Sequence, residues 1–469
     1  MSTSREDVSA PAYILGIDLG TTSVKAALID SDTKEIVSTA SSETGAGVSS
    51  EIGPQGNEQD TSKIIRACSA CVSGLPRDNL VKVRSIGVSG QMHGCVLWKS
   101  GNGWSNTGTS GYDTDKCSHL VTWQDQRCSS EFLASLPAPK SHLRLATGHG
   151  CATLFWLQRN RPEVIQEYDC AGTIQDFLVT MLCNLQKPLM SVQNAASWGY
   201  FDTINKVWNI EVLSEAGFPV HLLPDVKIPG VEAGHLESSW CGIPKGIPVG
   251  VALGDMQCSI LPSLKIETDA VLNISTSAQL SFKMPRNFIP PHSEPGSAIE
   301  YFPYFNDSYL AVAAALTGGN ALATLVKMLQ QWMHDLGHET PQAQIYDKLL
   351  SSAQETKETD LVISPTLFGE RHLPNQRASV TNITTENVSL GHLSRAACHG
   401  IISNLHDMMS RDFLVKSGVN RIVGSGSALT RNKVLQQEIE SIFDLPLLYG
   451  QGGDAAVGAA LTRTMKFTD

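Results

Sequence analysis

Two short segments pair a tight turn with the side chains that phosphate and Mg²⁺ binding need. Asp18 ends an apolar stretch and is followed by Leu-Gly-Thr-Thr-Ser at 19–23. Backbone N–H groups and hydroxyls of such a turn can donate to phosphate oxygens, and the carboxylate can hold a hydrated cation. A second hydroxyl-rich turn, Ser275-Thr276-Ser277, follows the apolar stretch 270–274. An ordinary hairpin with an Asp-capped turn explains the first segment equally well.

Asp255 is a candidate general base. It follows Gly254 at the end of the apolar stretch 247–253. A carboxylate at a strand end can accept the proton of an attacking hydroxyl, and such a base accelerates a reaction by roughly 10²–10⁴-fold. Taken alone, a Gly-Asp turn is more often structural.

A third group of residues fits a sugar pocket, where planar polar side chains meet hydroxyls and an aromatic ring covers C–H groups. Each member alone is more often structural: Trp123 as a core residue, Arg127 with Asp125 as an ion pair, His93 as a hydrogen-bonded strand end. Their occurrence beside two phosphate-type turns favours a polyol pocket. The group comprises Gln91, Met92, His93, Trp123, Asp125, Arg127 and Asp176.

Several other site classes are excluded by missing residues. In the glycine-rich segment 424–428 the last glycine of GxGxxG would fall on Leu429, so the segment is no dinucleotide fingerprint. Neither GxxxxGK[ST] nor GxSxG occurs, which excludes a P-loop and an α/β-hydrolase elbow. Cys68 and Cys71 form a CxxC with no second pair at zinc spacing, so we interpret them as small helix side chains.

The elements that must position these residues alternate between strand and helix, which predicts an α/β fold. A strand, a hydroxyl-rich turn and a second strand open at 13–29, and the same unit recurs at 270–282. This repeat predicts two domains, 1–258 and 259–469. A last helix at 454–465 begins Ala-Ala-Val-Gly-Ala-Ala, which is small enough to pack its backbone closely against a neighbour.

The net charge and the lack of long apolar runs argue against two classes of partner, nucleic acids and membranes. The 469 residues carry a net charge of −11, which argues against a nucleic-acid partner. No apolar run of about 18 residues occurs, so no membrane partner is expected. The polar N-terminus lacks a secretory signal, and the eleven scattered cysteines are an odd number, which together predict a cytoplasmic protein.

Taken in order, the motifs resemble those of the FGGY carbohydrate kinases along nearly the whole chain. The motifs that carry the resemblance are Gly-Ile-Asp-Leu-Gly-Thr-Thr at 16–22, Ser-Gly-Gln-Met-His-Gly at 89–94, Trp-Gln-Asp-Gln-Arg at 123–127, Asn-Ala-Ala-Ser with Phe-Asp at 194–202, Gly-Asp at 254–255, Gly-Glu-Arg at 369–371, Gly-Ser-Gly-Ser at 424–427 and Asp-Ala-Ala-Val-Gly-Ala-Ala at 454–460.

The resemblance implies two actin/hexokinase-like, ribonuclease H-like domains around a central cleft, with ATP and Mg²⁺ as cofactors. It implies Asp255 as the catalytic base and Asp18 as the Mg²⁺ ligand. The implied sugar contacts are Gln91, Met92, His93, Trp123 and Asp176. The implied nucleotide contacts are Gly20, Thr21, Thr22, Ser23, Lys25, Ser275, Thr276, Ser277, Gly318, Gly319, Gly424, Gly426, Ser427 and Asn432.

The chain departs from the family pattern beside the predicted base. Many members carry a polar residue directly after that Asp, whereas this chain has Met256, and Gln257 is the nearest candidate for the missing sugar contact. The adenine segment reads Gly-Ser-Gly-Ser-Ala-Leu-Thr-Arg-Asn at 424–432, which leaves the purine contacts open. Neither departure removes the base or the phosphate turns.

The expected activity is therefore transfer of a phosphoryl group from ATP to the terminal hydroxyl of a ketose. The stretches at 121–125, 133–137, 194–201 and 369–374 resemble those of family members that act on sedoheptulose, and this resemblance implies sedoheptulose 7-phosphate as product. Xylulose, ribulose or another polyol is the alternative substrate. An actin-like ATPase scaffold without a sugar pocket, and a regulatory protein that binds sugar without catalysis, are the alternatives from other classes. The oligomeric state does not follow from the sequence.

Overall fold

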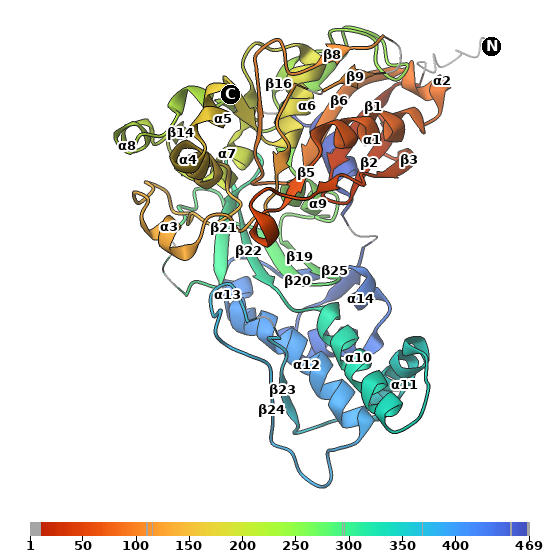
Figure 1. Ribbon diagram of the computed structural model, residues 1–469. Helices are drawn as coiled ribbons and strands as arrows, with labels where there is room; N and C mark the ends of the chain where they lie inside the picture. Colours follow the sequence, from red (N-terminus) through yellow and green to blue (C-terminus); the bar gives the residue numbers. More distant parts are fainter. Residues whose placement is uncertain are drawn as a thin grey trace, which may run out of the picture. The chain divides into compact units, whose positions relative to one another are not determined.

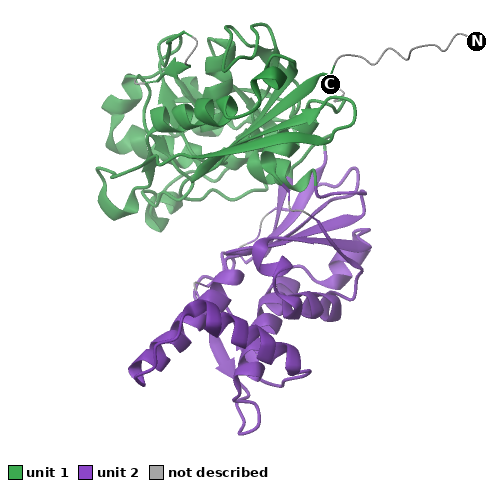
Figure 2. Ribbon diagram, turned by 90° about the vertical axis from the view of Figure 1, so that its right-hand side faces the viewer, with its two compact units in different colours: residues 1–262, 303–307, 454–469 green, residues 263–302, 308–453 purple. Residues whose placement is uncertain are grey.

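In the computed structural model of the protein, residues 11–108, 111–114, 116–292, 294, 296–367, 369–450 and 453–466 are described. The chain divides into two compact units, drawn in green and purple in Figure 2. Unit 1 comprises Met1–Pro262, Pro303–Asp307 and Asp454–Asp469, and unit 2 comprises Ser263–Phe302 and Ser308–Gly453. The expected boundary after residue 258 lies four residues before the first break. It also placed 454–469 in the second domain, whereas this segment packs in unit 1.

Unit 1 is built on a mixed sheet with the strand order β16-β17-β6-β1-β2-β3, in which the central pairs are parallel and the outer pairs antiparallel. β1 pairs with β2 antiparallel and with β6 parallel, and β17 and β18 also run parallel to β6. The bounds are β1 Tyr13–Leu19, β2 Ser23–Asp30, β3 Ile36–Glu43, β6 Val83–Gly90, β16 Glu232–His235, β17 Pro248–Gly250 and β18 Leu253–Gly254. Val251 and Ala252 interrupt the single strand that was expected at 247–253.

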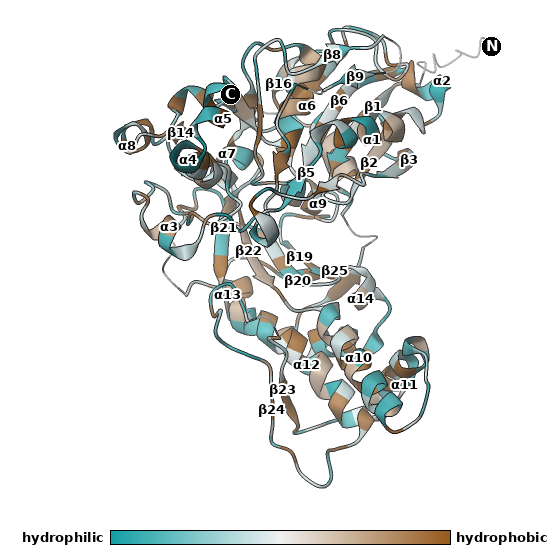
Figure 3. Cartoon of the chain, viewed as in Figure 1, coloured by the Kyte–Doolittle hydropathy of each residue, from teal (hydrophilic) through white to brown (hydrophobic). Residues whose placement is uncertain are grey.

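Helices cover both faces of this sheet. α1 (Thr61–Ser73) and α6 (Ile174–Cys183) share one apolar core with the inward face of β1. All ten residues of α6 are buried, and Figure 3 draws this helix mainly in the apolar range of colours. Cys68 and Cys71 are buried on α1, as interpreted from the sequence. The opposite face packs on α16 (Ala455–Thr462).

The small residues of α16 allow a backbone-to-backbone contact that fixes the centre of unit 1. A Cβ on Gly16 would lie 1.8 Å from the carbonyl oxygen of Ala456, and one on Gly458 would lie 1.8 Å from that of Cys258. Real Cβ atoms cannot approach a carbonyl this closely, so only glycine fits. Close packing of the helix at 454–465, predicted from its composition, is thereby confirmed.

The rest of unit 1 consists of shorter elements around the sheet. The helical pattern expected from 143 to 184 contains a strand, β11, between α5 and α6. The remaining bounds are β4 Gly47–Val48, β5 Glu58–Gln59, β7 Val96–Trp98, β8 Ser105–Asn106, β9 Tyr112–Asp113, β10 Leu120–Val121, β11 Cys170–Gly172, β12 Leu189–Ser191, β13 Phe201–Asp202, β14 Val207–Trp208, β15 Asp225–Lys227, α2 Arg77–Leu80, α3 Ser130–Ala134, α4 Gly150–Asn160, α5 Pro162–Gln166, α7 Val192–Trp198, α8 Ile210–Glu215 and α9 Asp255–Ile260, with 3₁₀ turns at Gly53–Gln55 and Val220–Leu222.

Unit 2 carries a second sheet with the order β21-β22-β20-β19-β25-β26. Its core joins this sheet to α12 and α15. The bounds are β19 Asp269–Ile274, β20 Ala278–Lys283, β21 Ile299–Pro303, β22 Tyr309–Ala315, β23 Val362–Ser364, β24 Ser379–Thr381, β25 Arg421–Ser425, β26 Leu447–Tyr449, α10 Gly319–Asp335, α11 Gln342–Glu355, α12 Leu390–Met408, α13 Arg411–Lys416, α14 Ser427–Thr430 and α15 Lys433–Phe443. Figure 1 shows α10, α11 and α12 grouped together in this unit.

The two sheets repeat one topology. In unit 1 the order β3-β2-β1-β6-β17 runs from two antiparallel pairs into two parallel pairs, and in unit 2 β22-β20-β19-β25-β26 does the same. The predicted repeat of strand, turn and strand in each half, and the α/β class, are therefore confirmed. Among the helices that the structure describes, none is both long and apolar enough to cross a membrane.

Candidate active site

Three strands of unit 1 end at one edge of the sheet. β1 and β18 both pair with β6, with Leu19 and Gly254 each opposite Gly90. In α/β sheets, ligands bind beyond the carboxyl ends of the strands. The predicted phosphate turn, the predicted sugar-reading segment and the predicted base follow these three strand ends, so the structure brings them together.

Asp18 and Asp255 form an electrostatically coupled pair at this edge. Burial, together with the negative charge of Asp18, raises the pKa of Asp255 to about 7. Burial also raises the pKa of Asp18 to about 6, partly offset by a hydrogen bond from the Ser89 hydroxyl at 3.0 Å. Asp255 opens α9, and its Oδ1 accepts a hydrogen bond from the backbone N–H of Met256 at 2.7 Å. One carboxylate of this pair is thus poised to hold a proton near neutral pH.

Two further charges act on Asp18. Lys25 lies directly opposite Asp18 in the β1–β2 ladder, and its charge lowers the pKa of Asp18. Asp454, whose carboxylate caps α16 by accepting from the N–H of Ala456 at 2.8 Å, raises it. Sequence reasoning named the motif that begins at Asp454 but gave that residue no role. The sequence feature that could have identified Asp454 is an acidic N-cap residue directly before a helix of small residues.

The turn after β1 is linked to two predicted sugar contacts. The indole N–H of Trp123 donates to the Thr21 hydroxyl at 3.1 Å, and that hydroxyl donates to Gln91 Oε1 at 3.4 Å. Gln91 is 1% exposed, whereas Trp123 is 39% exposed. An exposed indole beside buried amides can offer a ring face to a ligand. Of the other turn residues, Thr22 is exposed, and Gly20 and Ser23 are partly exposed.

His93 is held in an unusual backbone conformation. Its φ is +73°, in the left-handed region that residues other than Gly adopt uncommonly. Its Nδ1 lies 2.8 Å from the carbonyl oxygen of Ser197. The His93 ring stacks on His149, with centroids 4.6 Å apart and planes 8° apart. Backbone strain of this kind concentrates at functional sites. His149 was missed by sequence reasoning, because a single His in a Gly-His-Gly turn carries no pattern.

Met92 and Gln257 crowd Gly254, the residue before Asp255. A Cβ on Gly254 would lie 2.3 Å from Gln257 Oε1 and 2.8 Å from the Met92 sulfur. Gln257 is fully buried, and its Nε2 donates to the carbonyl oxygen of Pro303 at 3.2 Å. Its Oε1 has no hydrogen-bond partner among the residues that the structure describes. A buried acceptor without a partner is costly, so this oxygen is an unsatisfied acceptor directly beside Gly254 and Asp255.

Asp176, a predicted sugar contact, also caps a helix. It is fully buried, and its Oδ2 accepts from the backbone N–H of Thr173 at 2.9 Å and from its hydroxyl at 2.6 Å, closing a capping box at the start of α6. Asn194 Nδ2 donates to the other oxygen at 3.4 Å. Burial raises the pKa of Asp176 to about 7. Both oxygens of Asp176 therefore have partners inside the protein, and its sugar contact stays a prediction.

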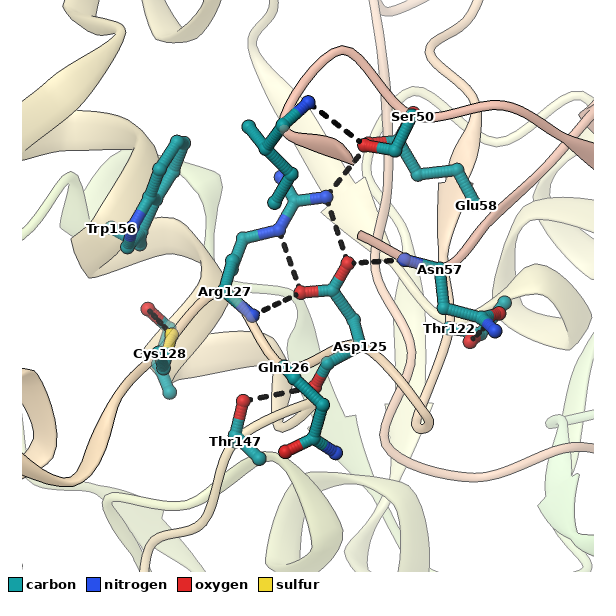
Figure 4. Close-up of polar contacts among 12 residues, drawn as sticks. Ser50, Asn57, Glu58, Thr122, Asp125, Gln126, Arg127, Cys128, Thr147 and Trp156 are labelled. Atoms are coloured by element: carbon teal, nitrogen blue, oxygen red, sulfur yellow. Dashed lines mark hydrogen bonds and ion pairs between the residues drawn. The ribbon is translucent and has the colours of Figure 1, made fainter. Parts of the chain in front are cut away.

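The Asp125–Arg127 pair is likewise internal (Figure 4). Arg127 donates through Nε to Asp125 Oδ1 at 2.8 Å and through Nη2 to Glu58 Oε1 at 2.7 Å, and its guanidinium lies 5.3 Å from the centre of the Trp156 ring. The backbone N–H of Asn57 donates to Asp125 Oδ2 at 2.8 Å. This network fixes the backbone that follows Trp123, as the ion-pair interpretation of the sequence expected.

In unit 2, the predicted nucleotide residues gather at the end of β19. The N–H of Gly319 donates to Ser275 O at 2.8 Å, and the N–H of Asn320 donates to Thr276 O at 3.0 Å, so the start of α10 rests on the hydroxyl turn. A Cβ on Gly426 would lie 2.2 Å from the carbonyl oxygen of Ile274, and Gly426 has a φ of +98°. Gly318 and the segment 424–427 therefore meet the turn at Ser275–Ser277. Because the N–H groups of Gly319 and Asn320 are used by the turn, the exposed residues Thr276 and Ser277 are the ones that can donate to a phosphate.

Asn432 and Glu370 of unit 2 are buried, and their side-chain oxygens bind backbone N–H groups. Asn432, a predicted nucleotide contact, is fully buried and caps α15 by accepting from the N–H groups of Val434 and Leu435 at 2.9 and 3.2 Å. Its side-chain oxygen is used by the helix, and the nucleotide contact of Asn432 stays a prediction. Glu370 of the Gly-Glu-Arg motif is 1% exposed and accepts from the N–H of Leu316 at 2.8 Å, which anchors the chain just before Gly318.

Comparison with known proteins identifies the family. A family model described as the N-terminal domain of the FGGY family of carbohydrate kinases matches residues 13–262. The chain is 54% identical to the sedoheptulokinase of Homo sapiens over 97% of this chain and 98% of that protein. It is 24% identical to the xylulose kinase of Escherichia coli over 95% of this chain and 88% of that protein.

Among solved structures, glycerol kinase of Plasmodium falciparum with ADP superposes with a TM-score of 0.79 at 19% identity, covering 96% of this chain and 89% of that chain. This likeness confirms the expected α/β fold with two actin/hexokinase-like domains. The chain therefore belongs to the FGGY family of carbohydrate kinases and is an ATP-dependent carbohydrate kinase.

Proposed function

We propose that the protein phosphorylates the terminal hydroxyl of sedoheptulose, giving sedoheptulose 7-phosphate and ADP. The observation that carries this substrate is the 54% identity to human sedoheptulokinase over nearly the full length of both chains, against 24% to a xylulose kinase. Gln91, Met92, His93, Trp123 and Gln257 are the proposed sugar contacts. The exposed Trp123 ring offers a face to C–H groups, and the unpartnered Gln257 oxygen offers an acceptor to a hydroxyl.

Asp255 is the proposed general base. Its raised pKa keeps it able both to accept and to release a proton near neutral pH, which is the range that suits a base. In the proposed step the sugar hydroxyl loses its proton to Asp255 while its oxygen bonds to the γ-phosphorus of ATP. The bond from that phosphorus to the bridging oxygen breaks, and ADP leaves. Phosphoryl transfer of this type depends mainly on positioning and charge stabilisation.

Mg²⁺ is the proposed metal cofactor, with Asp18 as its protein ligand. The charge of Asp454 raises the pKa of Asp18, and the charge of Asp18 raises the pKa of Asp255, so the surroundings of Asp18 are negative and oxygen-rich, which suits a hard cation. Among the residues that the structure describes, no group of three or more His, Cys, Asp or Glu is arranged to hold a metal. Mg²⁺ characteristically keeps several waters and binds through one or two carboxylates and phosphate oxygens, where it neutralises phosphate charge.

Each unit by itself carries a set of proposed nucleotide contacts. In unit 1 these are Gly20–Ser23 with Lys25, whose ammonium lies on the exposed face of β2. In unit 2 they are Ser275–Ser277, Gly318, Gly319 and the segment 424–427, at the start of α10. The reaction is proposed to take place in the cytoplasm, because eleven scattered cysteines suit a reducing compartment.

A sugar panel in an ADP-release assay tests the substrate. We expect a higher kcat/KM for sedoheptulose than for xylulose or ribulose, and little ADP release without sugar. A higher kcat/KM for a five-carbon ketose would replace sedoheptulose in the proposal while leaving the carbohydrate kinase activity intact.

Asp255→Asn tests the base. The amide cannot accept the proton, so kcat should fall by about 10²–10⁴-fold while the Kd of ADP changes little. Asp32→Asn, an exposed carboxylate in unit 1 outside the site, is the matched control and should keep full activity. Wild-type turnover by Asp255→Asn would refute the assignment.

A further inference from the structure

Gln59 lies between the proposed sugar contacts and the first phosphate turn, although no motif singled it out. It belongs to the short strand β5, and its backbone pairs with Leu120 of β10. β10 leads directly into Trp123, and the N–H of Thr122 donates to the carbonyl oxygen of Asn57 at 3.0 Å. The Gln59 side chain is 7% exposed, so its amide must find partners inside the protein.

Those partners close a ring of hydrogen bonds. Gln59 Nε2 donates to the carbonyl oxygen of Thr21 at 2.7 Å, and Gln91 Nε2 donates to Gln59 Oε1 at 3.0 Å. The Thr21 hydroxyl donates to Gln91 Oε1 at 3.4 Å, which completes the ring. Every donor in it points the same way round, an arrangement in which hydrogen bonds strengthen one another. Trp123 is not a member of the ring, but its indole N–H donates to the Thr21 hydroxyl at 3.1 Å.

The ring commits the single proton of the Thr21 hydroxyl to Gln91. While that hydrogen bond holds, the same proton cannot be given to a phosphate oxygen. A sugar hydroxyl that donates to Gln91 Oε1, or a sugar that displaces the Trp123 ring, competes with the bonds that Thr21 makes. Sugar occupancy and the state of the phosphate turn therefore act on the same hydroxyl.

We propose that Gln59 is a positioning residue that couples sugar binding at Gln91 and Trp123 to nucleotide binding at the Thr21 turn. Gln59 touches neither ligand. It holds the backbone of Thr21 and the amide of Gln91 in one unit, so that a change at one end is felt at the other. This inference rests on the proposed function, since it takes Gln91 and Trp123 as sugar contacts and Thr21 as a phosphate contact.

The test measures coupling and not activity alone. Calorimetric titration gives the Kd of ADP with and without saturating sedoheptulose, and the Kd of sedoheptulose with and without saturating ADP. The two ratios must agree, because coupling between ligands is reciprocal. We expect about a tenfold ratio for the wild type, within the range usual for coupled sites. In Gln59→Leu, which lacks both amide contacts, the ratio should fall to about one.

Two further variants keep the test decisive. Gln59→Glu is nearly isosteric and can still accept from Gln91, but it cannot donate to the Thr21 carbonyl, so it should also lose the coupling. It decides the question if Gln59→Leu does not fold. Thr44→Val removes a hydroxyl that donates to Thr22 O at 3.2 Å and reaches Thr21 O only at 3.5 Å. It leaves the Gln59 bonds intact and should keep the wild-type ratio.

The outcomes separate this inference from the proposed function. If the wild type phosphorylates xylulose or ribulose in place of sedoheptulose, the substrate proposal fails and the titration is repeated with the sugar that is turned over. If the wild type is active and coupled but Gln59→Leu and Gln59→Glu retain the ratio, Gln59 is only structural. A wild-type ratio of one, or equal loss in Thr44→Val, also overturns the role of Gln59.

Discussion

The hairpin that opens unit 1 and the hairpin that opens unit 2 share a backbone but differ in what surrounds it. β1–β2 and β19–β20 each enclose a three-residue turn, at 20–22 and 275–277. The residue before the last of the first strand is Asp18 in one and Asn273 in the other. The same device thus presents a buried negative charge in unit 1 and a neutral amide in unit 2.

The supports of the two turns differ as well. The turn of unit 1 is held by side chains from separate segments, among them Gln59, Thr44 and Trp123. The turn of unit 2 is held by the backbone at the start of α10. A turn held by side chains can shift when those side chains bind a ligand. A turn beside a helix N-terminus instead has a fixed electrostatic field from the helix dipole. The same hairpin is thus supported by side chains in unit 1 and by backbone in unit 2.

The largest expected effect comes from the residue two positions before Asp18 or Asn273, where the packing of the two hairpins differs. Gly16, two residues before Asp18, corresponds to Val271, two residues before Asn273. Gly16→Val would force a side chain into the carbonyl of Ala456, so α16 could not stay on β1. We expect Gly16→Val to lose the folded state of unit 1, measured as loss of the thermal transition and of near-UV circular dichroism. Val271→Ala should cost only about 1–3 kcal/mol, as a core truncation does.

The second effect removes the charge difference itself. Asp18→Asn gives the first hairpin the side chain of the second. If Asp18 holds Mg²⁺, kcat should fall by about 10²-fold or more, and the Mg²⁺ concentration for half-maximal rate should rise. The measurement is the rate as a function of Mg²⁺, with Asp32→Asn as control. An unchanged Mg²⁺ dependence would remove Asp18 from the metal site.

These contrasts show what the residues could and could not predict. The two hairpins, the strand-end carboxylates Asp18 and Asp255 and the close-packing last helix followed from local pattern, because apolar runs and small residues report their own burial. Asp176 and Asn432 were predicted as ligand contacts, and their helix-capping bonds were not foreseen, since capping depends on where a helix starts.

Other features lay beyond local pattern altogether. Gln59 sits on a two-residue strand and His149 in a glycine turn, and neither has a periodic neighbourhood that would mark it. The return of 454–466 to unit 1 could not be predicted either, because it depends on contacts with strands more than 360 residues earlier in the chain, as between Ser89 and Ala455.

The third effect concerns stability and pH. The pKa of Asp255 is raised from 3.8 to about 7 in the folded protein, so the folded state binds the proton more tightly than the unfolded state does. Folding stability then falls as the pH rises from about 4 to about 7, and the full penalty remains above that range. Asp255→Asn has no charge to bury, so it should be more stable than the wild type at pH 8 and nearly equal at pH 4.

The size of this effect is modest because Asp255 is partly exposed. We expect a gain in Tm of about 2–4 °C at pH 8, corresponding to about 1 kcal/mol. Thermal scans at both pH values, without nucleotide and Mg²⁺, measure it. A gain that is equal at the two pH values would show that the stabilisation does not come from ionisation of Asp255.

The smallest expected effect gives the second hairpin the charge of the first. Asn273 is exposed and accepts from the Ser275 hydroxyl at 3.1 Å, and an Asp can keep that bond. Its added charge would repel a phosphate at Ser275–Ser277, so Asn273→Asp should weaken ADP binding by about 3–5-fold. The loss should shrink as NaCl rises from 50 to 500 mM, because exposed charges are screened.

Asn420→Asp is the matched control for this change. Asn420 also accepts from a hydroxyl, that of Thr268 at 3.0 Å, but it precedes β25 and so lies at the opposite edge of the unit 2 sheet. A charge there is far from the proposed phosphate site and should leave the Kd of ADP unchanged. If both variants weaken binding equally, the effect is one of net charge, and the turn at Ser275–Ser277 does not hold the phosphates.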